Sequence, residues 1–125
     1  MRNQKMVQTI LIVDDDPAGT RLLATLLEME GYQPASVQDW RDPLNDVEHL
    51  RPDLILMDIY LRTTTGFALL ERLRNHPDPE IAQTPVLLMS AEDQAARSRQ
   101  AGADGFLIKP YPIQDLLDAI HRVGT

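Results

Sequence analysis

The amino-acid sequence predicts an α/β fold in which a parallel sheet of five strands is covered by helices on both faces. Short apolar runs alternate along the chain with longer stretches whose apolar residues recur every three or four positions, which is the pattern of strands joined by helices. The runs at 53–58 and 85–90 are apolar almost throughout, as is typical of central strands that are buried on both faces. Proline and glycine stand at several boundaries between the runs and the stretches, where they begin and end elements.

Five strands and five helices are expected in alternation. The strands are predicted at 9–14, 33–38, 53–58, 85–90 and 105–109, and the helices at 17–30, 43–50, 66–74, 92–101 and from 113 onward. At the first helix, Asp16 has the residue type of an N-cap, Pro17 suits the first helical position and Gly31 suits a C-terminal cap. The stretch at 75–84 contains two prolines and is expected to be a connector.

Apolar residues on one face of each helix are expected to pack on the sheet. They are Leu22, Leu23, Leu26, Leu27 and Met29 in the first helix, Phe67, Leu70 and Leu73 in the third, and Ile113, Leu116, Leu117 and Ile120 in the last. The second strand contains Pro34, which cannot donate a ladder hydrogen bond, and the fifth strand is short, so both are placed at the edges. The result is a (βα)5 doubly wound parallel sheet with the strand order 2-1-3-4-5, the flavodoxin-like arrangement.

Length and composition limit the classes of protein to which the chain can belong. Its 125 residues suffice for one domain, which we place at 9–125 after an N-terminal extension at 1–8. The chain has no cysteine, so disulfides and thiol catalysis are excluded. A net charge of −7 with scattered arginines argues against direct nucleic-acid binding. The sequence has neither a signal-peptide pattern nor an apolar run of membrane-spanning length, and we therefore expect a cytoplasmic protein.

Polar residues that can carry chemistry stand where four of the predicted strands end. Asp14 and Asp15 end the first run, Asp58 the third, Ser90 the fourth and Lys109 the fifth. Because the carboxyl ends of parallel strands meet at one edge of a sheet, these side chains are expected to share a pocket. Crowded carboxylates favour a cation, and hard oxygen ligands suit Mg²⁺. A carboxylate nucleophile, a metal, a hydroxyl and an ammonium together form a set suited to phosphoryl transfer.

Four short motifs lie at these strand ends. They are Ile-Val-Asp-Asp-Asp-Pro at 12–17, Pro-Asp-Leu-Ile-Leu-Met-Asp at 52–58, Ser-Ala at 90–91 and Ala-Gly-Ala-Asp-Gly-Phe-Leu-Ile-Lys-Pro at 101–110. In this order and at these positions they resemble the receiver domain of bacterial two-component response regulators, of the chemotaxis-regulator-like type. Each motif alone is weak, but the four together are specific. The resemblance runs from about residue 9 to residue 123, nearly the whole chain.

The resemblance implies a role in phosphorylation for the residues at the pocket. Asp58 is the expected phosphoacceptor. Mg²⁺ is the expected cofactor, held by Asp58, by Asp14 and Asp15 (one of this pair acting through water) and by the backbone carbonyl of Tyr60. The expected donor is a phosphohistidine on a sensor histidine kinase or on a phosphotransfer protein.

The resemblance also implies how phosphorylation is transmitted. Ser90 is the expected switch hydroxyl, Lys109 pairs with the phosphoryl group, Phe106 is the switch aromatic, and the Lys109–Pro110 peptide bond is expected to be cis. The signal would pass through the last two predicted helices and the strand between them to a downstream effector protein or a fused output domain. The chain is not expected to be an enzyme beyond weak autophosphatase activity.

Three departures from the family pattern stand out. The usual proline four residues after the phosphoacceptor is Arg62, and Thr63, Thr64 and Thr65 replace a glycine-rich acidic loop, so a less fixed loop backbone is expected. Tyr60 is bulky and is expected to lean over the phosphoryl group beside Glu92. The interval from the switch hydroxyl to the lysine is about three residues shorter than usual, close to one helical turn. Because this shortens the expected signalling face, dimerisation through it is left open.

Two other functions remain open at the level of sequence. A phosphatase of the haloacid dehalogenase type would use Asp14 as its nucleophile, but the chain lacks a cap segment and Asp58 would then have no role. A pseudo-receiver would bind a protein partner without taking phosphate, and Arg62 and the shortened helix leave room for it. We interpret Asp16 as a helix cap rather than as a metal ligand.

Overall fold

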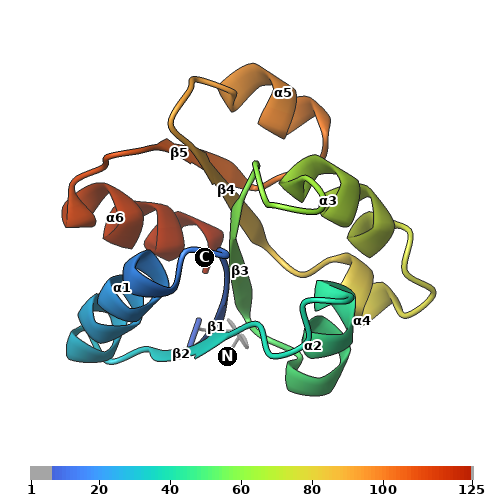
Figure 1. Cartoon of the computed structure of the whole chain (residues 1–125), viewed down its shortest axis with the longest axis horizontal. Helices are drawn as coiled ribbons and strands as arrows, with labels where there is room; N and C mark the ends of the chain where they lie inside the picture. Colours follow the sequence, from blue (N-terminus) through green and yellow to red (C-terminus); the bar gives the residue numbers. More distant parts are fainter. Residues whose placement is uncertain (1–6, 125) are drawn as a thin grey trace, which may run out of the picture.

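The computed structural model describes residues 7–124 and contains one sheet of five parallel strands (Figure 1). The strands are β1 (Thr9–Val13), β2 (Gln33–Ser36), β3 (Leu54–Asp58), β4 (Val86–Ser90) and β5 (Gly105–Ile108). Their order is β2-β1-β3-β4-β5, so the predicted topology is confirmed. Each strand is one or two residues shorter than predicted; the residues lost are polar or proline, except Val37 after β2.

The described part of the chain contains six helices, five between strands and α6 after the last strand. They are α1 (Pro17–Met29), α2 (Pro43–Leu50), α3 (Gly66–Arg74), α4 (Pro79–Ala82), α5 (Ala95–Gln100) and α6 (Ile113–Val123). The connector predicted at 75–84 contains one helical turn that was not predicted, α4, where Pro79 begins the turn and the Asp78 side chain accepts a hydrogen bond from the N–H of Glu80. Helix α5 has six residues and begins at Ala95, later than predicted, where the N–H of Ala95 donates to Oδ1 of Asp93 at 3.0 Å.

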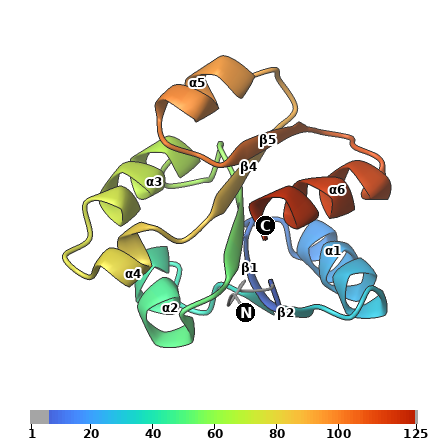
Figure 2. The ribbon, with the colours of Figure 1, turned by 180° about the vertical axis from the view of Figure 1, so that it is seen from behind.

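The helices divide into two layers around the sheet. Helices α1 and α6 lie on one side and α2, α3 and α4 on the other, a division that is equally clear from behind (Figures 1 and 2). Alternate residues of each strand point to opposite sides. Ile10 and Ile12 of β1 therefore pack in the cluster that contains Leu23 of α1. Leu11 and Val13 pack in the cluster of α2 and α3, which Phe106 joins from β5.

Some apolar residues that were expected in the core are exposed. Leu23 and Leu27 of α1 are buried, but Leu22 is 63% exposed and Met29 is 76% exposed. Leu23 and Leu27 are four positions apart and share the side that faces the sheet, whereas a neighbouring position is turned by about 100°. Ile113, at the first turn of α6, is also exposed. The apolar pattern thus located both helices but overestimated the width of their buried faces.

The two ends of α1 differ from each other in how well they were predicted. Gly31 adopts φ +92°, and its N–H donates to the carbonyl of Glu28 while the N–H of Tyr32 donates to that of Leu27, which confirms the C-terminal cap. Asp16 occupies the N-cap position, but its side chain makes no capping hydrogen bond. The predicted N-cap position is therefore confirmed, although the Asp16 side chain does not cap the helix; the N–H of Asp16 itself donates to Oδ1 of Asp14.

The strand register places the candidate residues at one edge of the sheet. Asp58 lies beside Met89 in the β3–β4 pair, and Ser90 lies beside Ile108 in the β4–β5 pair. Lys109 directly follows Ile108 and therefore leaves the sheet at the same level as Asp58 and Ser90. This edge is the carboxyl edge of a parallel sheet, where ligands of such folds bind.

The expected N-terminal extension at 1–8 falls mainly outside the described residues. Gln8 is described, and its N–H donates to Oδ2 of Asp53 at 3.0 Å, so the chain already belongs to the fold at that point. Among residues 7–124, none of the helices combines the length and the apolar character that crossing a membrane would require.

Candidate functional site

The carboxylate of Asp58 forms an ion pair with the ammonium of Lys109 at the carboxyl edge of the sheet. Asp58 Oδ1 lies 2.6 Å from Lys109 Nζ, and Asp58 is only 9% exposed. Asp14, directly after β1, places its Oδ2 at 3.5 Å from the same ammonium. The Lys109–Pro110 peptide bond is cis, as expected. Three of the predicted residues from three different strands thus meet in one place.

The electrostatics of this group are set by burial and by an excess of carboxylates. Burial raises the pKa of Asp58 to about 6; Lys109 lowers it by its hydrogen bond, and Asp14 raises it. Burial lowers the pKa of Lys109, but the Asp58 and Asp14 carboxylates outweigh it, so the net pKa is raised. One ammonium faces two carboxylates, and an additional cation would be favoured here. Asp14 and Asp58 therefore fit the donor set of a magnesium site.

The carboxylates of Asp14 and Asp15 point in different directions. Asp14 is held by the N–H of Asp16 at 2.9 Å, and its backbone carbonyl accepts from the hydroxyl of Thr20 at 3.1 Å. Asp15 Oδ2 instead accepts from the N–H of Arg62 at 2.7 Å. Within residues 7–124, no three acidic or histidine side chains are grouped closely enough to hold a metal ion. The structure thus brings Asp14 to Asp58 but holds Asp15 against the loop after β3.

That loop is folded back on itself as a small hairpin. Tyr60 and Thr65 form an antiparallel bridge, and the N–H of Leu61 donates to the carbonyl of Thr64 at 3.2 Å. Thr65 Oγ1 then accepts from the N–H of Ala68 at 3.1 Å and caps α3. These contacts close the loop, while the expectation of a less fixed backbone than is usual stays a prediction.

The start of α3 lies unusually close to the strand end that carries Asp58. The N–H of Gly66 donates to the carbonyl of Ile59 at 2.6 Å. A Cβ atom at position 66 would lie 2.6 Å from the backbone oxygen of Asp58. Only glycine allows the two backbones to approach so closely. Gly66 therefore sets the distance between α3 and the end of β3.

Of the two other predicted switch residues, Ser90 lies at the same edge and Phe106 lies within β5, and neither forms a hydrogen bond with Asp58 among the described residues. Ser90 is 4% exposed, and its Oγ accepts a hydrogen bond from the N–H of Glu92 at 3.1 Å. Phe106 is half-buried and packs against the core cluster of α2 and α3.

The arrangement of these residues can be compared with known proteins. A sequence model of the response regulator receiver domain matches residues 10–121 of the chain. The chain belongs to the response regulator receiver domain family. As a receiver domain it is a module of two-component systems, and the predicted resemblance is confirmed.

Relatives and solved structures agree with the assignment as a receiver domain. The chain is 38% identical over 117 residues to the DNA-binding dual master transcriptional regulator RpaA of Synechocystis, an alignment that covers 91% of this chain and 48% of RpaA. The signal receiver domain of a histidine kinase from Syntrophus aciditrophicus has a TM-score of 0.81 at 33% identity, covering 93% and 89% of the two chains. Chemotaxis response regulator CheY4 of Vibrio cholerae has a TM-score of 0.81 at 26% identity, covering 94% and 99%.

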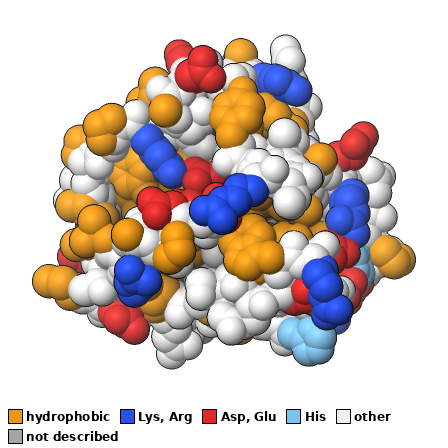
Figure 3. Space-filling view, viewed as in Figure 1, with side chains coloured by type: hydrophobic (Ala, Val, Ile, Leu, Met, Phe, Trp, Pro, Cys, Tyr) orange, Lys and Arg blue, Asp and Glu red, His pale blue; other side chains and the backbone are white. Residues whose placement is uncertain are grey.

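The receiver domain spans about half, or less, of the length of the curated relatives that it matches. Some of these relatives are named as DNA-binding or transcriptional regulators. The expectation of no direct nucleic-acid contact therefore concerns this domain alone and stays a prediction. On the face shown in Figure 3, Lys and Arg side chains are interspersed with acidic ones and form no continuous basic stripe.

One contact at the pocket of the receiver domain was missed by sequence reasoning. The hydroxyl of Tyr60, whose side chain is 52% exposed, accepts a hydrogen bond from Nε2 of Gln94 at 2.8 Å. The sequence pointed to Glu92 as the neighbour of Tyr60, whereas the hydrogen bond comes from the residue two positions later. No motif marks Gln94, so only the tertiary structure could identify it.

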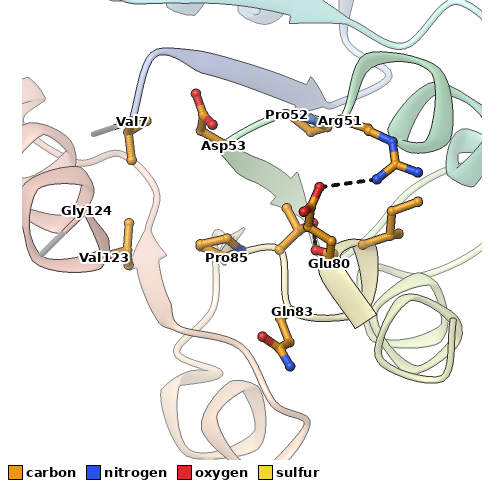
Figure 4. Close-up of a pocket in the computed structure, with 11 residues that line it drawn as sticks. Val7, Arg51, Pro52, Asp53, Glu80, Gln83, Pro85, Val123 and Gly124 are labelled. Atoms are coloured by element: carbon orange, nitrogen blue, oxygen red, sulfur yellow. Dashed lines mark hydrogen bonds and ion pairs between the residues drawn. The ribbon is translucent and has the colours of Figure 1, made fainter. Parts of the chain in front are cut away.

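Two other cavities lie away from Asp58. One of about 240 Å³ lies at the amino edge of the sheet between Pro52, Pro85 and Val123, beside the Arg51–Glu80 ion pair (Figure 4). A groove of about 480 Å³ lies between β2 and α2, lined in part by Ala35 and Leu50. Neither contains any residue of the site, so cavity size does not locate the chemistry of this domain.

Proposed function

We propose that this receiver domain is a phosphorylation switch in which Asp58 accepts a phosphoryl group. The observation that carries the proposal is the buried Asp58 carboxylate at a strand end, 2.6 Å from Lys109 and beside Asp14. The donor is a phosphohistidine on a sensor histidine kinase or a phosphotransfer protein. The receiver then acts on a downstream effector or on an output domain, in keeping with relatives about twice as long.

The chemistry is an in-line displacement at phosphorus. A carboxylate oxygen of Asp58 attacks, the bond from phosphorus to the imidazole nitrogen of the donor breaks, and that nitrogen keeps the electron pair. Lys109 turns from the Asp58 carboxylate to the phosphoryl oxygens and compensates their charge. Mg²⁺ would be held by Asp58, by the backbone carbonyl of Tyr60 and by the pair Asp14 and Asp15, with one member of that pair acting through water. When bound, the ion neutralises negative charge shared between the nucleophile and the phosphoryl group.

The switch follows from the groups that the new charge attracts. Phosphorylation adds up to about two negative charges at Asp58. The Ser90 hydroxyl, which now accepts from the N–H of Glu92, turns to donate to a phosphoryl oxygen. Phe106 then changes its packing, and the surface of α5, β5 and α6 shifts between two populations. A dimer through this face stays open because α5 is only six residues long.

The two alternative functions are less well supported. A dehalogenase-type phosphatase would attack with Asp14, but Asp14 lies farther from Lys109 than Asp58 does, at 3.5 Å against 2.6 Å. A pseudo-receiver takes no phosphate, so it would have no use for a buried Asp58 carboxylate paired with Lys109. Named relatives are regulators, which supports a regulatory role with at most slow autophosphatase activity.

Intact-mass measurement after treatment with acetyl phosphate and Mg²⁺ tests the proposal. Wild type should gain one phosphoryl group, and Asp58→Asn should gain none. Asp14→Asn should lose most of the adduct because its metal site is weakened, and excess Mg²⁺ should restore it in part. No adduct on the wild type would contradict the switch, and an adduct on Asp58→Asn would point to another nucleophile.

A further inference from the structure

The hydrogen bond between the backbone of Arg62 and the side chain of Asp15 joins two parts of the site that are 47 residues apart in sequence. The N–H of Arg62 donates to Asp15 Oδ2 at 2.7 Å. Both the short distance and the charged acceptor are typical of strong charge-assisted hydrogen bonds. Asp15 is one of the expected magnesium ligands, so this hydrogen bond is made to a group that would bind the metal.

The bond exists only because position 62 is not proline. Proline has no backbone N–H and could not donate to Asp15. The receiver-domain pattern usually has proline at this position, four residues after the phosphoacceptor, and this chain has Arg62. This departure from the pattern thus introduces a hydrogen-bond donor directed at the acid pair.

The donor is held in place by the rest of the loop. The Tyr60–Thr65 bridge and the hydrogen bond from Leu61 to Thr64 close the hairpin on both sides of Arg62. The Arg62 residue is exposed, and none of the described acids forms an ion pair with its guanidinium. The backbone N–H, rather than the charged side chain, is therefore the group that acts on Asp15.

We infer that the Arg62 N–H restrains the Asp15 carboxylate and lowers the affinity of the site for Mg²⁺, an inference that rests on the proposed function. Asp14 and Asp58 already meet at Lys109, while Asp15 is bound to the loop and completes no three-acid group among the described residues. Because Oδ2 of Asp15 accepts from Arg62, coordination of the metal through that oxygen must break or lengthen the bond. Arg62 is thus a positioning residue that couples metal binding to the loop beside the phosphoacceptor.

A pair of substitutions separates the backbone donor from the side chain. Arg62→Pro removes the guanidinium and the N–H, whereas Arg62→Ala removes the guanidinium alone. Titration calorimetry with Mg²⁺ alone should give a dissociation constant about tenfold lower for Arg62→Pro than for Arg62→Ala, as expected when a hydrogen bond to a charged group no longer competes. Equal or weaker binding by Arg62→Pro overturns the inference.

The same two substitutions made in the Asp15→Ala variant control for any change that proline makes in the conformation of the loop. In Asp15→Ala, the difference between Arg62→Pro and Arg62→Ala should disappear, because the acceptor is gone. A difference that persists in Asp15→Ala overturns the inference. In the wild type, the amide proton of Arg62 should shift on Mg²⁺ addition in nuclear magnetic resonance spectra, and an unmoved amide at saturating Mg²⁺ also overturns it.

These outcomes can be told apart from failure of the proposed function. A wild type that binds no Mg²⁺ overturns this inference together with the metal part of the proposal. A wild type that binds Mg²⁺ and becomes phosphorylated on Asp58, but whose two Arg62 variants bind Mg²⁺ equally, overturns this inference alone.

Discussion

The buried Asp58 carboxylate pairs with the half-buried Lys109 ammonium, yet the lysine does not restore the ordinary pKa of the carboxyl group. Nζ and Oδ1 are 2.6 Å apart, yet burial holds the pKa of Asp58 at about 6, and Asp14 adds to the effect. The charged form of the expected phosphoacceptor is therefore disfavoured in the folded, metal-free protein. The direction of this pKa shift predicts how the stability of the protein changes when the Asp58 carboxylate is removed. It also predicts how the pKa of Asp58 changes when Lys109 is removed.

Asp58→Asn should stabilise the metal-free protein at pH 7.5. The folded-state pKa of about 6 lies above the ordinary 3.8, so the folded state binds the proton more tightly than the unfolded state. The carboxylate therefore lowers the free energy of unfolding above pH 6, and this cost disappears as the pH falls from 6 to 4. Chemical denaturation in EDTA should show a gain on the order of 2 kcal/mol at pH 7.5.

The gain should shrink toward zero at pH 4. Asp118→Asn on the exposed side of α6 is the matched control, with an expected change within about 0.5 kcal/mol at either pH. A loss of stability in Asp58→Asn at pH 7.5 would show that the Lys109 ion pair outweighs burial.

Lys109→Met should raise the pKa of Asp58 above 6 in the metal-free protein. The hydrogen bond from Lys109 lowers the pKa of Asp58, and its removal leaves burial and Asp14 unopposed. The titration of the Asp58 carboxyl carbon by nuclear magnetic resonance measures the change. Arg99→Met, on exposed α5, is the control and should leave the pKa of Asp58 unchanged. A lower pKa of Asp58 in Lys109→Met would show that Lys109 does not stabilise the charged carboxylate.

Gly66→Ala should destabilise the protein by about 1–3 kcal/mol. The added Cβ would lie 2.6 Å from the backbone oxygen of Asp58 and 3.1 Å from Cα of Ile59, neither of which can rotate away. Gly105→Ala is the control, since its Cβ would meet the end of the Leu87 side chain at 2.7 Å, which can rotate. Thermal unfolding should therefore rank Gly66→Ala as the less stable variant, and the reverse order would contradict this prediction.

Tyr60→Asn should shorten the lifetime of phosphorylated Asp58. The Tyr60 side chain extends from the residue two positions past Asp58 to Gln94 and is expected to hinder the water that hydrolyses the acyl phosphate. Tyr60→Phe keeps the ring but removes the hydrogen bond from Gln94, and should lie between wild type and Tyr60→Asn. Decay of the phosphorylated mass after removal of acetyl phosphate measures each rate, and equal rates for all three proteins would refute the hypothesis.

The sequence by itself determined the order of the strands and the identity of the residues at their ends. Uniformly apolar runs mark β3 and β4 as central, Pro34 marks β2 as an edge strand, and parallel strands must end at one edge. From that alone Asp14, Asp58 and Lys109 could be expected together, and the ion pairs join them. These features follow from the local residue pattern and from the order of the elements, and both can be inferred from the amino-acid sequence.

Only the tertiary structure decided where individual side chains point and what surrounds them. The adjacent residues Asp14 and Asp15 have the same chemistry, yet one faces Lys109 and the other the N–H of Arg62. The pKa of Asp58 depends on burial by residues from several strands, and the partner of Tyr60 is set by where α5 begins. Direction and burial arise from contacts between segments far apart in sequence, and no local pattern encodes them.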